Sequence, residues 1–171
     1  MRKLIFILAL ALCAPAFAAS GLHAYFKTEP VKIGGGKYYY KGLIHAYDAA
    51  LYSANGKFDP DKMFALELIY QTDIDGDDIA VKSIEEMNKI SAVDKDKADK
   101  WLEQMKAIFP NVVDGTNITG INIPGKGVVF LKDGKKIGQI DDTEFSQRFF
   151  DIWLNPKTSG KKLRAKLLGD K

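Results

Sequence analysis

The stretch GVVFLKDGKKIGQI, residues 127–140, decides the fold class. Its Asp133-Gly134 pair separates two short runs rich in apolar residues, and an Asp-Gly pair in that setting is a strong signal for a two-residue β-hairpin turn. The sequence therefore predicts two antiparallel strands, Gly127 to Leu131 and Lys135 to Ile140. Outward from this hairpin, strand-like patterns recur in three earlier segments: Lys37 to Ser53 with a break at Gly42, Phe64 to Gln71, and Ile118 to Ile123.

Helical spacing of apolar residues follows these strands in both halves of the chain. One helix is expected from about Asp77, and a second ends at Pro110. Asp141 with Glu144 three residues later is a capping-box variant that opens a third helix, and Ser159 begins a last short one. Because the groups of strands and helices are joined by hairpins rather than alternating as βαβ units, they predict an α+β domain with a largely antiparallel sheet.

Two motifs that often bind ligands are present only in part. No lysine-serine/threonine pair or GxGxxG spacing accompanies Gly34-Gly35-Gly36, so these glycines predict a turn rather than a phosphate-binding loop. In the acidic segment Asp73 to Asp78, Gly76 is fourth and the twelfth position is Ile84, which does not fit an EF-hand. Carboxylates at a helix N-terminus explain the segment instead, and we expect neither a metal site nor a cofactor.

The first residues have the pattern of a secretory signal peptide. Arg2-Lys3 precede an apolar run from Leu4 to Leu12, and Ala16-Phe17-Ala18 is the small-x-small pattern of a cleavage site. Leu12 stands where a lipoprotein signal would have a small residue before Cys13, so lipidation is not expected. The sequence therefore predicts a signal peptide over residues 1–18, export to the periplasm, and no integral membrane segment after cleavage.

Composition limits the classes of partner that the mature chain could bind. Of 25 basic and 22 acidic residues, cleavage removes only Arg2 and Lys3, which leaves 23 basic residues and a formal charge of +1. This balance argues against a nucleic-acid partner. The single cysteine is lost with the signal peptide, and the two histidines, His23 and His45, are too few for a zinc site. Residues 19–171 are expected to form one domain, as a monomer.

Polar side chains interrupt strands that are otherwise apolar. Convergent polar groups between two apolar layers are typical of a small-molecule pocket. The same groups also have a purely structural interpretation, because lysines can extend along apolar surface and Asp48 can pair with a lysine. Spacing alone leaves both interpretations open for Lys37, Tyr39, Lys41, Asp48, Glu67 and Tyr70.

An ordered set of short stretches spans nearly the whole chain after residue 18: Gly34 to Lys37, Lys41-Gly42, Ala46 to Tyr52, Ala65 to Leu68, Ser83 to Met87, Gly138 to Asp142, Phe145, Phe149-Phe150, Ile152 to Ser159 and Leu163-Arg164. In this order they resemble the bacterial, exported branch of the chalcone isomerase-like family. The resemblance implies an open-faced β-sandwich, in which helices cover one face of a large antiparallel sheet and a cleft lies between the layers.

The plant isomerases of this family cyclise a chalcone to a flavanone with an arginine, a threonine and a tyrosine near the ligand, and related plastid proteins bind fatty acids in the same cleft. Matched to this chain, the arginine falls on or beside Lys37, the threonine on Asp48 and the tyrosine near Ile79. An asparagine on the following helix falls near Glu86. Ring closure needs aimed donors, but Ile79 has no proton to donate and Asp48 adds a negative charge. We therefore expect the fold without the chalcone isomerase reaction.

The leading hypothesis is a non-catalytic periplasmic protein that binds a small amphipathic or fatty-acid-like ligand in the cleft, with Lys37 facing a carboxylate. The expected cleft residues are Lys37, Asp48, Glu67, Tyr70, Ile79, Glu86, Ile152 and Trp153. A cleft filled by Tyr38, Tyr40, Phe149 and Trp153 would argue against binding. Two alternatives stay open: an isomerase or lyase of another substrate with Asp48 as general base, and a partner-binding component of the envelope.

Overall fold

The computed structural model describes residues 21–169, so the predicted signal peptide lies outside the described residues. A short 3-10 helix (Leu22–Ala24) comes first. The remaining elements, in chain order, are β1 (Val31–Tyr40), β2 (Ile44–Ser53), β3 (Phe64–Tyr70), α1 (Gly76–Ile90), α2 (Lys95–Ile108), β4 (Asn117–Ile123), β5 (Gly127–Lys132), β6 (Lys135–Ile140), α3 (Thr143–Leu154) and α4 (Lys161–Leu167).

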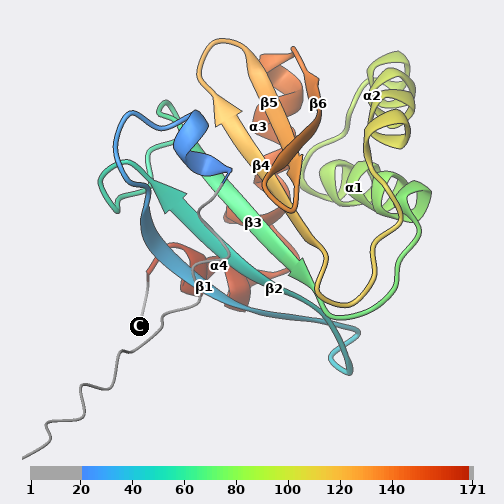
Figure 1. The fold of residues 1–171 in the computed structure, drawn as a ribbon. Coiled ribbons are helices and arrows are strands. Elements are labelled where there is room, and N and C mark those ends of the chain that lie inside the picture. Colours follow the sequence, from blue (N-terminus) through green and yellow to red (C-terminus); the bar gives the residue numbers. More distant parts are fainter. Residues whose placement is uncertain (1–20, 170–171) are drawn as a thin grey trace, which may run out of the picture.

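The six strands form one sheet in chain order, and each strand is antiparallel to its neighbours (Figure 1). The predicted hairpin joins β5 to β6 through Asp133 and Gly134, whose φ angles are 48° and 78°. Positive φ at both central residues is what a tight hairpin turn with the right twist requires. The prediction of an α+β domain with a large antiparallel sheet is confirmed.

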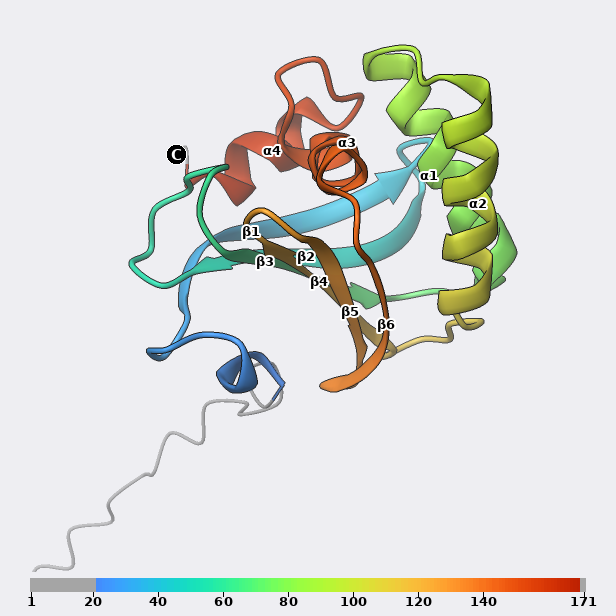
Figure 2. The ribbon, with the colours of Figure 1, turned by 90° about the horizontal axis from the view of Figure 1, so that it is seen from above.

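Helices cover one face of this curved sheet. Figure 2 shows α3 and α4 lying over the sheet, while α1 and α2 form a pair beside its far end. Most of the core lies between the two layers and includes the fully buried side chains of Trp101, Phe130 and Phe145. A smaller cluster on the opposite face of the sheet contains Leu22 and Phe26. Between residues 21 and 169, no helix combines the length and apolar character that a membrane crossing requires.

The three glycines lie inside strand β1, so the prediction of a turn at this position is wrong. A Cβ added to Gly34 would lie 2.1 Å from the carbonyl oxygen of Lys166 in α4, and one added to Gly36 would lie 2.8 Å from the Lys166 side chain. The first distance is closer than a side chain can approach the backbone, whereas the flexible Lys166 side chain could move away from a Cβ at Gly36. Gly34 is therefore needed for close packing of α4 against β1, a contact between segments about 130 residues apart.

Helix α3 begins one residue later than the sequence suggests. Its N-cap is Asp142 rather than Asp141, and the Asp142 carboxylate accepts a hydrogen bond of 3.0 Å from the backbone N–H of Phe145. The same carboxylate accepts a second bond of 3.0 Å from the indole N–H of Trp101 in α2. Asp142 thus caps one helix and fixes a second helix beside it.

Candidate functional site

A cavity of about 570 Å³ lies between the helix-covered face of the sheet and the helices. Strands β1 to β3 form one wall, α1 and α3 form the other, and the segment before α4 closes one side. Three apolar lining residues, Tyr40, Ile44 and Val81, are 39%, 52% and 39% exposed, so they mark an opening to solvent. The volume falls in the usual range for small-molecule sites.

Aromatic side chains form much of the wall. The Tyr38 and Tyr47 rings stack with centroids 5.0 Å apart, and the Tyr47 and Tyr70 rings meet edge to face at 5.9 Å. On the helical side, Trp153 packs against Phe149 and donates a hydrogen bond of 3.0 Å to the Tyr47 hydroxyl. Tyr38, Tyr40, Phe149 and Trp153 therefore line the cavity but leave it open.

Two buried phenols supply neutral polar groups in this wall. Burial raises the pKa of both Tyr47 and Tyr70 far above the ordinary tyrosine value, so both stay protonated. Tyr47 accepts its bond from Trp153 and keeps its own proton to donate. Tyr70 is only 4% exposed, and it lines the cavity.

Charged groups gather where α1 meets the cavity. Lys82 lies 2.9 Å from Glu85 and 3.2 Å from Glu86, and Lys89 lies 2.7 Å from Glu86. Glu86 also accepts a hydrogen bond of 2.9 Å from the Ser159 hydroxyl. Burial acts to raise the pKa of Glu86, but bonds from Lys89, Ser159 and Lys82 outweigh it and hold that pKa below its usual range.

Five of the eight expected cleft residues line the cavity: Tyr70, Ile79, Glu86, Ile152 and Trp153. The other three, Lys37, Asp48 and Glu67, do not, and their placement in the cleft is wrong. They point to the opposite face of the sheet. Within the described part of the chain, no cluster of three or more side chains suited to binding a metal occurs either.

Lys37 and Asp48 face away from the cavity because each is one position along its strand from a residue that lines it. Neighbouring strand residues face opposite sides of a sheet, so the residues that face the cavity are the next ones, Tyr38 and Tyr47, which are cross-strand partners. The register of β1 and β2 also shifts between Tyr38 and Tyr39, which leaves one extra residue in β2. This bulge puts His45 and Asp48, three residues apart, on the same face.

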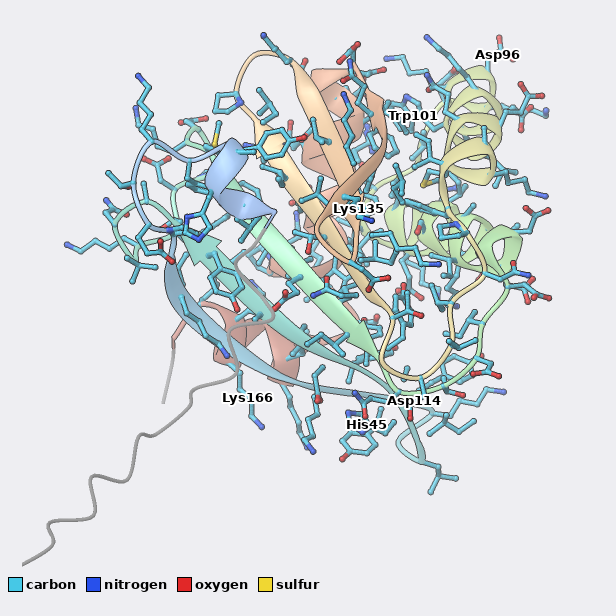
Figure 3. The ribbon with its side chains drawn as sticks, viewed as in Figure 1. His45, Asp96, Trp101, Asp114, Lys135 and Lys166 are labelled. Atoms are coloured by element: carbon cyan, nitrogen blue, oxygen red, sulfur yellow. The ribbon has the colours of Figure 1, made fainter. Side chains whose placement is uncertain are left out.

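His45 and Asp48 form a contact on the face of the sheet that points away from the cavity. Their side chains lie 2.8 Å apart, and the Tyr39 ring stacks on His45 with centroids 4.9 Å apart. The Asp48 side chain is 42% exposed. Figure 3 shows His45 near the free end of the β1–β2 hairpin. Because the sheet separates this pair from the cavity, Asp48 cannot serve as a general base inside it.

Glu67 lies on the same face of the sheet, away from the cavity, where it is buried and held by two hydrogen-bond partners. It accepts hydrogen bonds of 2.7 Å from the Asn117 amide and 3.2 Å from the Tyr52 hydroxyl. Burial raises the pKa of Glu67, although both hydrogen bonds act to lower it. Burial and the neighbouring Glu67 raise the pKa of Tyr52 to about 12. Glu67 therefore has a structural role in the sheet.

Sequence reasoning missed Tyr47, Lys82 and Ser159 as members of the site, and it considered Tyr38 only as a side chain that would fill the cleft. The pleat of β2 does place Tyr47 and Asp48 on opposite faces, but it does not say which face carries the helices. One signal could have decided this: the apolar face of β3 carries Leu66, Leu68 and Tyr70. Tyr70 is the cross-strand partner of Tyr47. A tyrosine aligned with that face is a better cleft residue than the aspartate next to it.

A curved antiparallel sheet with helices on one face and an aromatic cavity between the layers defines an open-faced α+β fold with an internal cavity. The crystal structure of a fatty-acid binding protein of Arabidopsis thaliana has a similar fold, with a TM-score of 0.63 over 81% of this chain and 86% of that chain. The two sequences are 14% identical, so this similarity shows the fold alone.

Sequence comparison identifies the family. The family model described as chalcone isomerase-like matches residues 30–169. A Haemophilus influenzae protein, described as uncharacterized, is 30% identical over 138 residues, which cover 80% of this chain and 67% of that protein. The chain belongs to the chalcone isomerase-like family.

Proposed function

We propose that the protein is a non-catalytic binding protein that holds a small amphipathic or acyl ligand in the cavity between sheet and helices. The cavity itself supports this proposal most strongly: it is about 570 Å³ in volume, is lined mainly by apolar and aromatic side chains, and carries charged groups along its α1 side. The name of the Arabidopsis protein, which has the same fold, supports a ligand with an acyl chain.

The lining residues favour binding over catalysis of the family's named reaction. Ile79, near the position of the plant tyrosine, lines the cavity with a hydrocarbon side chain. Tyr38 and Tyr47 occupy the wall at the positions beside Lys37 and Asp48. Burial raises the pKa of both phenols, and Glu86 raises that of Tyr38 further. Such groups donate hydrogen bonds but exchange protons poorly at neutral pH.

We also propose that the protein acts outside the cytoplasm after removal of residues 1–18. The pattern of residues 1–18 supports this location. The mass of the protein recovered from the periplasm of its own cells tests the proposal. A chain that begins near Ala19 is expected, and a full-length chain retained in the cytoplasm would contradict it.

Native mass spectrometry of the protein purified from its own cells tests ligand binding. A small molecule bound in one-to-one ratio is expected. Ala46 lines the cavity and is 5% exposed, so Ala46→Phe should fill the site and abolish the adduct. Ala107→Phe is the matched control, because Ala107 is exposed on α2 and outside the lining. Circular dichroism shows that each variant is folded. Wild-type protein without any adduct, and with no uptake of an added amphiphile, would contradict the proposal.

A further inference from the structure

The charges that line the cavity are not balanced. Four acidic side chains and one basic side chain line it: Asp73, Asp78, Glu85, Glu86 and Lys82. Asp73 lies in the loop before α1 and Asp78 in the first turn of that helix, and both are exposed. Neither forms an ion pair within residues 21–169. The opening of the cavity therefore carries two carboxylates that form no ion pair with a described residue.

Two cations near the opening, Lys82 and Lys89, are already paired. Lys82 contacts Glu85 and Glu86, and Lys89, just outside the lining, also contacts Glu86. Two lysines and two glutamates thus neutralise one another. A ligand carboxylate would have to displace a glutamate to reach either lysine. The N-terminus of α1 adds only about half a positive charge, which does not offset two carboxylates.

The aromatic rings at the opening offer faces that attract cations. Tyr40 lines the opening, and the ammonium group of Lys41 already lies 5.4 Å from the centroid of its ring. Tyr38 lines the same wall and stacks on Tyr47. Cations bind to such ring faces, most strongly where water is partly excluded.

We propose that the cavity selects amphipathic ligands whose polar end is a cationic amine, and disfavours free fatty acids. Its apolar and aromatic interior takes the hydrocarbon body, while Asp73, Asp78 and the ring faces of Tyr38 and Tyr40 surround the ammonium group. This inference rests on the proposed function, since it assigns the ligand class for the same cavity. It also removes the role of Lys37, which faces the other side of the sheet.

Three ligands with the same twelve-carbon chain test the proposal: dodecylamine, dodecanol and laurate, titrated by calorimetry below their aggregation concentrations at neutral pH and low salt. The amine is expected to bind about tenfold more tightly than laurate, with dodecanol between them. Added salt should reduce the ratio of amine affinity to laurate affinity, because exposed charges are screened. Laurate binding as tightly as the amine would overturn this inference and leave the proposed function standing. Failure of all three to bind would overturn the proposed function itself.

Removal of two negative charges at the opening, or at a distant site, shows whether the acidic opening or the net charge of the protein sets the preference for the amine. In Asp73→Asn/Asp78→Asn the preference for amine over laurate should fall to about threefold or less, with dodecanol affinity unchanged. The control Asp96→Asn/Glu103→Gln removes two charges from exposed positions of α2, outside the lining, and should keep the full preference. Figure 3 shows Asp96 at the outer end of α2. An equal loss in both double variants would overturn the role of the opening.

Discussion

The indole N–H of Trp153 donates a hydrogen bond of 3.0 Å to the hydroxyl of Tyr47, which joins helix α3 to strand β2 across the cavity wall. Tyr47→Phe leaves this N–H without its acceptor, and we expect it to lower the free energy of unfolding by about 1 to 3 kcal/mol. Trp153→Phe/Tyr47→Phe removes both partners and should cost less than the sum of the single changes. Urea unfolding of the four proteins measures this coupling.

Tyr25→Phe serves as the control for loss of a phenol hydroxyl, because Tyr25 packs in the smaller cluster on the other face of the sheet. It should have little effect. Strictly additive costs for Tyr47→Phe and Trp153→Phe would show that the hydrogen bond does not couple the two layers.

Close packing of α4 on β1 predicts that Gly34→Ala is destabilising. The new Cβ would lie 2.1 Å from the Lys166 carbonyl oxygen, so the helix must move outward. We expect a loss of about 1 to 3 kcal/mol in thermal or urea unfolding. Gly120→Ala in β4 is the matched control, since its Cβ would meet the Phe150 ring at an ordinary 3.4 Å. If Gly34→Ala proved as stable as Gly120→Ala, the close contact would not be real.

Asp142 and Asp141 are adjacent carboxylates with different expected contributions. Asp142→Ala removes the cap of α3 and leaves the fully buried Trp101 N–H without an acceptor, so we expect a loss of about 2 to 4 kcal/mol. Asp141→Ala, which loses only a contact with the exposed Gln139, should be close to neutral. Equal effects in urea unfolding would refute the assignment of the cap.

Acidification should weaken the same cap. Burial acts to raise the pKa of Asp142, but the Phe145 and Trp101 hydrogen bonds outweigh it and lower that pKa below its ordinary value. A carboxyl whose pKa is lowered by folding stabilises the protein above its unfolded-state pKa, and this contribution is lost as the pH falls through the folded-state pKa. Asp142→Asn should therefore differ most from wild type near neutral pH and converge with it in acid.

Buried Glu67 has the opposite dependence. Burial raises its pKa, so the neutral form is favoured by folding, and its contribution to stability is lost as the pH rises from the ordinary value of 4.5 through the raised value. Glu67→Gln should flatten this decline in urea unfolding across the range from about pH 4 to 8. Glu103→Gln, at an exposed site on α2, is the control and should keep the wild-type slope. An unchanged slope in Glu67→Gln would exclude a raised pKa.

Local patterns predicted most of the fold but only part of the site. Turn chemistry predicted the Asp133-Gly134 hairpin. Short-range periodicity predicted strand β3 and the helices α1 to α4. Gly34 of β1 depends instead on α4, about 130 residues later, because the contact with the α4 backbone leaves no room for a side chain. A run of glycines read locally looks like a turn.

Assignment of strand faces limited prediction of the site. Ile152, Trp153 and Tyr70 were predictable because helix and strand periodicity place them toward the opposite layer. Lys37 and Asp48 were placed wrongly because a displacement of one residue changes the face, and the register shift in β2 becomes visible only once the strands are paired. Polarity in a strand therefore indicated a special position without showing on which side of the sheet it acts.

The most direct test of the central claim uses the two tryptophans as reporters. Trp153 lines the cavity, whereas Trp101 in α2 lies outside its lining and donates a hydrogen bond to Asp142. Figure 3 labels Trp101. Trp101→Phe and Trp153→Phe each leave one indole, and each protein is titrated with a dodecanol that carries bromine at the far end of its chain. We predict saturable quenching of Trp153 fluorescence and no quenching of Trp101 fluorescence. Equal quenching of both indoles, or of neither, would contradict a ligand site between the sheet and the helices.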